Sequence, residues 1–455
     1  MVGKSSSRFV PKCRVSVGVG PSEPGNPATV YDRTMISFIP SEDLVADPSP
    51  AIDREWVVTN GTGGYASGTV AGVLTRRYHG LLVAALDPPL GRTVLVSKID
   101  DSVSFGGRQI PLFANRWSDG SSPVEPDGFR YLTCFHLEGM TPVWSYEVDG
   151  AVLEKRIWMG PGANTTYVKY DYISGRGALC LEAKILVNYR DFHQTTRSGD
   201  WQMSVEAVAD GVCVDAFDGA APIFLLSDGA TIESRHEWYR DYYLSVEAFR
   251  GLGTLDDNLY AANVEAILRP GESVTLVLST EPDPQLDGEA ALAARERHEV
   301  DLLSAASVEE DDLLTRLVLA ADQFIVKRPS DGEAGSTIIA GYHWFGDWGR
   351  DTMIALPGLA LATGRHAEAR QILRTFARHV DRGMLPNRFP DDGDLPEYNT
   401  IDATLWFFEA IRAYHAATHD TELVVDLFPV LADIVGWHRR GSAAEFYDYR
   451  QQFRQ

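Results

Sequence analysis

Cysteine is scarce in this 455-residue chain, which has four: Cys13, Cys134, Cys180 and Cys213. They are scattered along the chain, and none belongs to a Cys-x-x-Cys pair. This spacing predicts neither a zinc site nor a disulfide framework. We therefore expect four reduced thiols.

Basic residues are also few, with 41 Lys and Arg against 64 Asp and Glu and a net charge of -23. Such a surface repels a phosphate backbone and offers no basic patch to anionic lipid. No run reaches the roughly 18 apolar residues of a membrane span, and the N-terminus lacks the apolar core of a signal peptide. The sequence predicts a cytoplasmic protein without nucleic-acid or membrane partners, and it leaves the oligomeric state open.

Hydrophobic residues make up 44% of the chain and aromatic residues 10%, which is enough for packed cores in two or three domains. Residues 1–50 are rich in Ser, Pro and Gly and show little periodicity. They are interpreted as a disordered leader or a mis-assigned start, with Met35 as the alternative first residue.

Residues 51–285 contain short alternating or apolar runs separated by turn residues, a pattern typical of strands. Many short strands of this kind predict an N-terminal antiparallel β-sandwich. The predicted strands are 80–86, 93–98, 152–158, 166–172, 179–187, 212–217, 222–226 and 273–279.

Residues 286–455 change to a helical composition near Ala290. Apolar residues then recur at spacings of three and four over 311–327, 352–363, 366–380, 402–417 and 421–438. Successive helices joined by loops with Gly, Pro, Asp and aromatic residues indicate an α/α toroid or a helical array. No repeat of fixed period is evident, which disfavours a solenoid.

Residues 343–358 combine aromatic side chains, carboxylates and an arginine in a loop that precedes a predicted helix. Indole faces stack on the apolar faces of pyranose rings, while Asp and Arg orient hydroxyl groups through charge-assisted hydrogen bonds. The pattern therefore indicates a sugar site. The alternative is a buried tryptophan pair with one structural Asp–Arg ion pair.

Residues 385–406 form a second polar loop, which runs into a predicted helix at Asp402. The helix dipole favours an ionised carboxylate there, so a general acid at this place needs burial or a neighbouring carboxylate to keep its proton. Helix capping is the alternative role for Asp402.

Residues 54–84 include a glycine-rich run and the string Arg76-Arg77-Tyr78-His79. The glycines lack the Lys-Ser/Thr of a phosphate-binding loop, so tight turns between strands are expected. Arg76, Arg77 and His79 either contact substrate or seat the β domain on the helical one.

These segments resemble the glycogen debranching enzymes of bacterial and archaeal type, which carry an amylo-α-1,6-glucosidase module. The resemblance spans roughly residues 52–440 and rests on 54–72, 75–84, 344–358 and 386–406. It implies a β-sandwich followed by an α/α six-hairpin toroid that removes the single glucose left at an α-1,6 branch. The implied partner is an α-glucan such as glycogen, limit dextrin or maltodextrin, and no metal or other cofactor is implied.

The resemblance also implies roles for individual residues. The Asp of the family's Asn-x-x-Asp-Ala string, here Asp402, is the implied general acid of an inverting mechanism, which requires a second carboxylate as base. Glucose contacts are implied for Trp344, Asp347, Trp348, Arg350, Asp351, Asn387, Tyr398 and Asn399.

The chain departs from the family pattern at its C-terminal end. The resemblance implies that the catalytic base lies beyond the last residue. About five helices are predicted, whereas a closed toroid of six hairpins needs twelve. Residues 441–450 also do not fit the family pattern. We therefore expect an incomplete toroid and negligible release of glucose by this chain. Asp394 and Glu397 lie near Asp402 in sequence, but neither is identified as the base. The alternatives are a non-catalytic α-glucan-binding module or another α/α-barrel glycoside hydrolase such as a glucoamylase.

Overall fold

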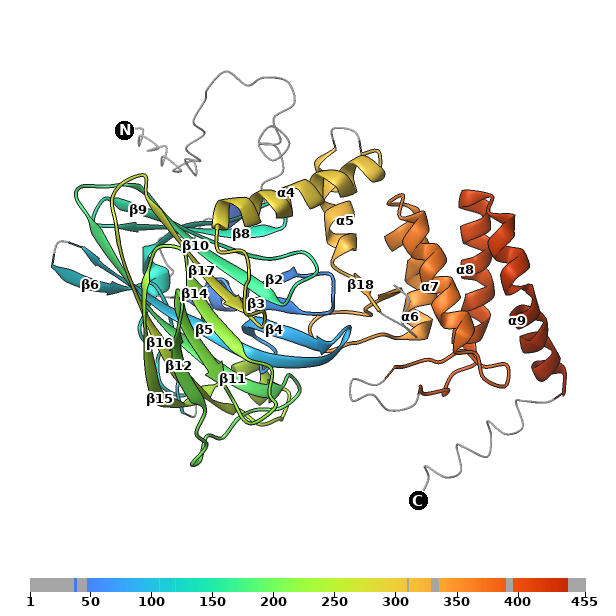
Figure 1. The fold of residues 1–455 in the computed structure, drawn as a ribbon, viewed down its shortest axis with the longest axis horizontal. Helices are drawn as coiled ribbons and strands as arrows, with labels where there is room; N and C mark the ends of the chain where they lie inside the picture. The colour runs from blue at the N-terminus through green and yellow to red at the C-terminus, as the bar shows by residue number, and fades with distance from the viewer. Residues whose placement is uncertain are drawn as a thin grey trace, which may run out of the picture.

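In the computed structural model, residues 37–38, 47–105, 107–118, 120–308, 311–328, 335–389 and 396–440 are described. Most of the predicted leader, Asp394 and residues 441–455 therefore lie outside the described residues. A β region, residues 47–279, lies at one end of the molecule. A helical region, residues 288–440, begins beside the β region and extends to the other end (Figure 1).

Two antiparallel sheets form the β region. The first has the order β1-β7-β8-β9-β10-β17-β14-β13-β12. Its strands are β1 (Ser37–Phe38), β7 (Leu132–Glu138), β8 (Thr141–Val148), β9 (Ala151–Met159), β10 (Thr165–Ser174), β12 (Ser204–Val208), β13 (Gly211–Asp215), β14 (Ile223–Ser227) and β17 (Ser273–Ser279).

The second sheet has the order β15-β16-β11-β5-β4-β3-β2, with β6 paired to β5. Its strands are β2 (Glu55–Thr59), β3 (Tyr65–Thr69), β4 (Gly80–Asp87), β5 (Leu90–Phe105), β6 (Arg108–Pro111), β11 (Leu179–Asp191), β15 (Thr231–Tyr243) and β16 (Leu255–Leu268). Three short helices join the strands: α2 (Ser49–Ile52), η1 (Gly128–Tyr131) and α3 (Ser245–Phe249). Six of the eight predicted strands lie inside observed strands, and the other two overlap β13 and β14, which confirms the β pattern.

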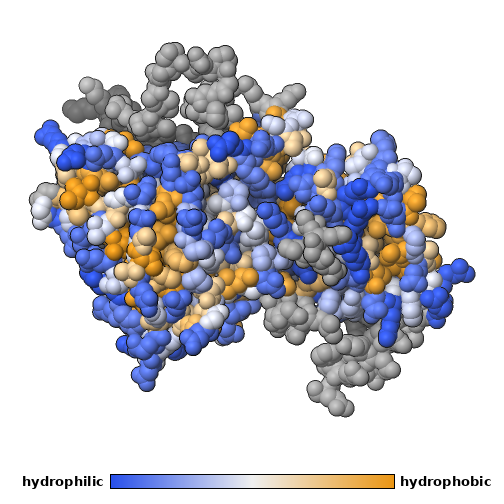
Figure 2. All heavy atoms as spheres, in the orientation of Figure 1, coloured by the Kyte–Doolittle hydropathy of each residue, from blue (hydrophilic) through white to orange (hydrophobic). Residues whose placement is uncertain are grey.

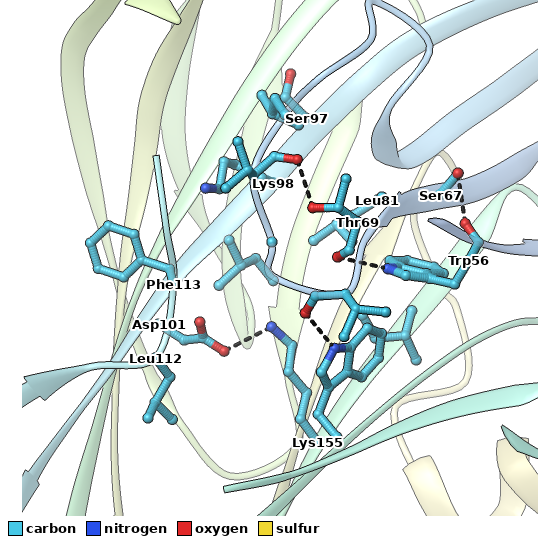
Figure 3. A pocket seen from close by; sticks show the side chains of 18 of the residues that line it. Trp56, Ser67, Thr69, Leu81, Ser97, Lys98, Asp101, Leu112, Phe113 and Lys155 are labelled. Carbon is cyan, nitrogen blue, oxygen red and sulfur yellow. Dashed lines mark hydrogen bonds and ion pairs between the residues drawn. The ribbon is translucent and has the colours of Figure 1, made fainter. Parts of the chain in front are cut away.

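One continuous apolar core lies between the sheets, and it encloses a cavity of about 50 Å³. Lys155 points toward Asp101 across this cavity, with the ammonium 2.7 Å from the carboxylate (Figure 3). The Tyr170 hydroxyl donates a second hydrogen bond to Asp101 at 2.9 Å. Buried charges are tolerated when they are paired in this way, so we interpret the cluster as part of the sandwich core.

The helical region begins with α4 (Gly288–Ala305), whose N-cap Asp287 accepts a hydrogen bond from the Ala290 amide. The other elements are α5 (Asp312–Asp322), β18 (Ile325–Lys327), β19 (Ser336–Ile338), α6 (Gly349–Leu356), the π-helical turn η2 (Pro357–Leu361), α7 (His366–Arg378), α8 (Asp402–Thr418) and α9 (Thr421–Arg440). The predicted helices are confirmed, except at the C-terminal end of the helix predicted over 311–327. The prediction of one helix over 311–327 is wrong beyond Asp322, because Ile325 and Val326 pair with β19 and the Lys327 amide donates to the Gly61 carbonyl of the β region.

The second core lies among α6, α7, α8 and α9, where Met353, Phe376 and Phe407 are buried and Leu423 and Ile434 of α9 pack against them. Within the described residues, no helix is both long enough and apolar enough to cross a membrane. The expectation of four reduced thiols is wrong for Cys134, which is disulfide-bonded; Cys180 and Cys213 are free.

Candidate active site

Two loops that are about fifty residues apart in sequence meet where α6 and α8 begin. The Gly349 amide donates to the Asn387 carbonyl at 2.9 Å, and Trp348 pairs with Arg388 in an isolated β-bridge. The Asn387 amide donates in turn to the Glu397 carbonyl at 2.8 Å. Main-chain hydrogen bonds thus bring together the two segments that the sequence singled out.

Arg350 and Asp402 form a two-point contact at the centre of this junction. The guanidinium Nε lies 2.9 Å from one carboxylate oxygen of Asp402, and Nη2 donates to the other at 3.0 Å. Both side chains remain accessible, at 41% and 45%. The N-cap of α8 is Ile401, so Asp402 is the first residue of the helix rather than its cap. The two-point contact fixes the orientation of a carboxylate that stays accessible to solvent.

Asp347 is fully buried, and its carboxylate accepts a hydrogen bond from Arg328 at 2.9 Å. Arg328 lies over the ring of Phe389 at 3.9 Å, and the Phe389 amide donates to the Asp347 carbonyl. These contacts clamp the two loops together. The glucose contact predicted for Asp347 stays a prediction.

The two tryptophans have different surroundings. Trp344 lies against the β region, with the guanidinium groups of Arg76 and Arg250 at 5.5 and 5.1 Å from its ring centre and Tyr78 at 5.8 Å. Trp348 instead makes an edge contact with Phe345 at 6.1 Å. Among the described rings, Trp344 and Trp348 make no contact with each other, so they do not form the buried pair of the alternative interpretation.

The remaining predicted glucose contacts lie around the same junction. Asn387 is buried and donates through its side chain to Asn399 at 2.9 Å. The Tyr398 hydroxyl donates to the His379 carbonyl at 2.7 Å, and burial raises the pKa of Tyr398. Asp351 is exposed in the first turn of α6.

Arg76 and His79 converge on Glu55, at 2.5 and 3.1 Å. Burial raises the pKa of Glu55, but the hydrogen bonds from His79 and Arg76 outweigh it and lower the pKa to about 2. Arg77 is directed elsewhere, to the buried Glu247 at 3.3 Å and to the His193 carbonyl. Of the three predicted residues, Arg76 contacts Trp344, His79 lies beside His343, and Arg77 stays inside the β region.

Two buried residues, His343 and Arg92, hold the first loop, and neither was among the predicted site residues. The His343 ring lies 2.6 Å from the Ser67 hydroxyl, and burial together with the nearby His79 lowers its pKa to about 3. Arg92 is fully buried and donates to the carbonyls of His343 and Phe345 at 3.1 and 2.8 Å. An arginine inside the apolar run of β5 was the available signal, because a buried guanidinium requires acceptors.

The junction therefore brings together an accessible carboxylate, an accessible guanidinium, the exposed amide of Asn399 and the partly exposed indole of Trp348, groups that can bind hydroxyls and a sugar ring. Within the described residues, no group of three or more His, Cys, Asp or Glu side chains could hold a metal ion.

Two solved structures show a distant likeness. A bacterial glucoamylase complexed with acarbose has a TM-score of 0.37 at 12% identity, covering 80% of this chain and 54% of its own. A family GH92 α-mannosidase from Bacteroides thetaiotaomicron has a TM-score of 0.24 at 8% identity, covering 79% and 51%. The chain thus spans about half the length of each.

Similarity in sequence identifies the family more specifically than the distant likeness in structure does. The glycogen debranching enzyme of Saccharomyces cerevisiae is 38% identical over 78 residues, which are 17% of this chain and 5% of the yeast enzyme. Residues 54–275 match the family model described as glycogen debranching enzyme N terminal, and residues 319–449 match the model described as amylo-alpha-1,6-glucosidase. The second match extends into 441–450, where the sequence was expected to depart from the family. The two matches span most of the chain and include both loops of the candidate site, so the chain belongs to the glycogen debranching enzyme family.

Proposed function

We propose that this chain carries the general acid of an α-1,6-glucosidase that removes single glucose residues from the branch points of glycogen, limit dextrin or maltodextrin. The observation that carries the proposal is the bidentate contact between Arg350 and Asp402, which unites both motif loops in a chain of the debranching family. The family consists of glycoside hydrolases, and Asp402 is an accessible carboxylate at the point where the loops meet, at the first residue of α8.

In this proposal Asp402 protonates the glycosidic oxygen while a second carboxylate, roughly 6.5 to 9.5 Å away, activates water on the opposite face of the sugar. An arginine beside a carboxyl group stabilises its ionised form, so Arg350 has to leave Asp402 when the acid is protonated. A glucose ring at the junction supplies hydroxyl acceptors for Arg350 and excludes water from Asp402. Arg350 then donates to hydroxyl groups of the substrate, and the Asp402 carboxyl group gives its proton to the glycosidic oxygen.

The other residues divide between direct contact and support. We assign the stacking face to Trp348 and hydroxyl contacts to Asp351 and Asn399, which are at least partly accessible. We assign a supporting role to four other predicted contacts, which hold the loops through the hydrogen bonds, ion pair and ring contacts given above: Trp344, Asp347, Asn387 and Tyr398.

We also propose that residues 51–285 form one domain and that 286–455 belong to an α/α six-hairpin toroid. The helices α6 and α8 pack on each other and both begin at the candidate site, as inner helices of a toroid do. The helices α7 and α9 then form the outer layer.

The test is the release of glucose from a limit dextrin, with the anomer followed by proton NMR. Because the base is not identified among the described residues, the enzyme is used in excess over branch points. Inversion predicts β-glucose as the first product. First appearance of α-glucose, or of maltose without glucose, would show that the proposed reaction is wrong.

The second candidate function is α-glucan binding without catalysis, favoured by the accessible Trp348 and the ion-paired Asp402. Electrophoresis of the chain through glycogen-containing gels measures binding alone. Retardation that is lost in Trp348→Ala, without glucose release by the parent chain, would support the binding module over the hydrolase.

A further inference from the structure

The short helix α3 of the β region lies beside the first loop of the candidate active site. Arg250 directly follows α3, and its guanidinium lies over the ring of Trp344, 5.1 Å from the ring centre. The guanidinium of Arg76 lies over the same ring at 5.5 Å. The β region therefore forms a wall next to this loop, and α3 is part of that wall.

A line of ring contacts leads from this wall to the proposed acid. The centre of the Trp344 ring is 6.0 Å from that of Phe345, which in turn is 6.1 Å from that of Trp348. Arg350 follows Trp348 by two residues and pairs with Asp402. The wall and the junction of the two loops are thus connected through Phe345.

The helix α3 is anchored to the β region by its own buried acid. Glu247 is fully buried, and its carboxylate pairs with Arg77 and with Arg250, each at 3.3 Å. The Arg77 amide donates a further hydrogen bond to it, also at 3.3 Å. These contacts fix the position of the residues that α3 presents to solvent.

Two phenyl rings at this place are left in water. Phe249, the last residue of α3, is 93% exposed, and Phe345 is 44% exposed. Among the residues that the structure describes, only three other Phe or Trp side chains are exposed: Phe217, Trp406 and Phe428. Exposed rings are therefore few, and two of them lie on either side of Trp344.

The two arginines of the wall keep hydrogen-bond donors free. Among the described residues, Arg250 makes one side-chain hydrogen bond, from Nη1 to Glu247, and Arg76 makes one, from Nε to Glu55. Their side chains are 34% and 19% accessible. Guanidinium groups that are held on a ring and still have N–H groups can donate to hydroxyls of a ligand.

We propose that Phe345, Phe249 and Arg250 bind the α-1,4-linked main chain of the branched glucan, an inference that rests on the proposed function. The single branch glucose occupies the junction of Arg350 and Asp402, so the main chain, which is the leaving group, has to lie outside it. Phenyl rings offer stacking faces to its pyranose units, and Arg250 offers donors to their hydroxyls. The β region then contributes to substrate binding as well as to stability.

The test is isothermal titration calorimetry of the full chain with maltoheptaose and with glucose. The parent should bind maltoheptaose more tightly than glucose. Phe249→Ala should weaken maltoheptaose binding roughly tenfold, with an unchanged thermal midpoint because the ring is exposed. Phe249→Tyr keeps a stacking face and should bind like the parent.

The control is Ile267→Ala, which removes an exposed apolar side chain from the far end of β16, roughly 40 Å along the strand from the end next to α3. Equal affinity of Phe249→Ala and the parent for maltoheptaose would overturn the proposal. So would an equal loss in Ile267→Ala, or a parent that binds maltoheptaose no more tightly than glucose. Maltoheptaose has no branch point and no bond is cut in this measurement, so failure here is separate from failure of the proposed glucosidase.

Discussion

His343 shows how burial fixes the charge state of a residue behind the candidate site. The ring lies between the Ser67 hydroxyl and His79, where a proton would have to be buried without water. Its pKa of about 3 means that the imidazole is neutral at neutral pH in the folded protein. In the unfolded chain the same group has a pKa of roughly 6.5.

This difference predicts a pH dependence of stability. Below about pH 6.5 the unfolded chain binds a proton at His343, whereas the folded chain does not bind it until about pH 3. The free energy of unfolding therefore decreases as the pH falls through this window, by up to about 1.4 kcal/mol per pH unit. Glu55, with a pKa of about 2, adds to the loss only below about pH 4.5. Urea unfolding between pH 7 and 5 should show a shallower dependence for His343→Gln than for the parent. The exposed His236→Gln is the control, and identical slopes for all three proteins would contradict the assignment.

We predict that Trp344 contributes mainly to stability and Trp348 mainly to glucan binding. Trp344→Ala removes the contacts with Arg76 and Arg250 and should lower the free energy of unfolding by about 2 kcal/mol. Trp348→Ala should change stability less and weaken retardation in glycogen gels more. Urea unfolding combined with affinity electrophoresis checks both, and the reverse order of effects would show that Trp344 is the sugar platform.

The element that joins the two loops is the first turn of α6. A β-carbon at Gly349 would lie 2.1 Å from the Pro386 carbonyl oxygen, so Gly349→Ala forces the loops apart and should cost roughly 2 kcal/mol or more. Gly358, in η2, has no atom within 4 Å of such a carbon, and Gly358→Ala should be neutral or stabilising by about 0.5 to 1 kcal/mol. Urea unfolding of both variants tests the contact; equal stability of the two would contradict it.

Elements with a buried face were predictable from sequence, and those without one were not. The strands β4 and β11 have apolar runs because they lie inside the second sheet, whereas most residues of the edge strand β15 are exposed, so it carries no such run. The strand β18 was mistaken for the end of a helix because the spacing of Ile325 and Val326 says nothing about their pairing with β19. The same limit applies to the site: both loops were identified, but the Arg350–Asp402 contact and the role of Arg92 depend on tertiary packing.

At the scale of the whole molecule, the helical end has an apolar surface (Figure 2). Its exposed side chains include Leu405 and Trp406 of α8 and Val425, Phe428 and Val435 of α9. An apolar patch of this kind promotes association. We predict self-association of the chain at tens of micromolar in sedimentation velocity, and its loss in Val425→Lys/Phe428→Lys with little change in thermal midpoint. A parent chain that stays monomeric would contradict this prediction.

The central claim is that Asp402 donates a proton to the leaving glycosidic oxygen. Fluoride needs no such proton, so the most direct measurement compares Asp402→Asn with the parent on a limit dextrin and on α-glucosyl fluoride, with the enzyme in excess over the substrate so that slow release is measurable. We predict a loss of at least about a hundredfold on the dextrin, a much smaller loss on the fluoride, and an unchanged thermal midpoint. Asp312→Asn, at the first residue of α5, is the matched control and should leave both rates unchanged. Equal losses on both substrates, or a retained dextrin rate with a lower thermal midpoint, would show that Asp402 is not the acid.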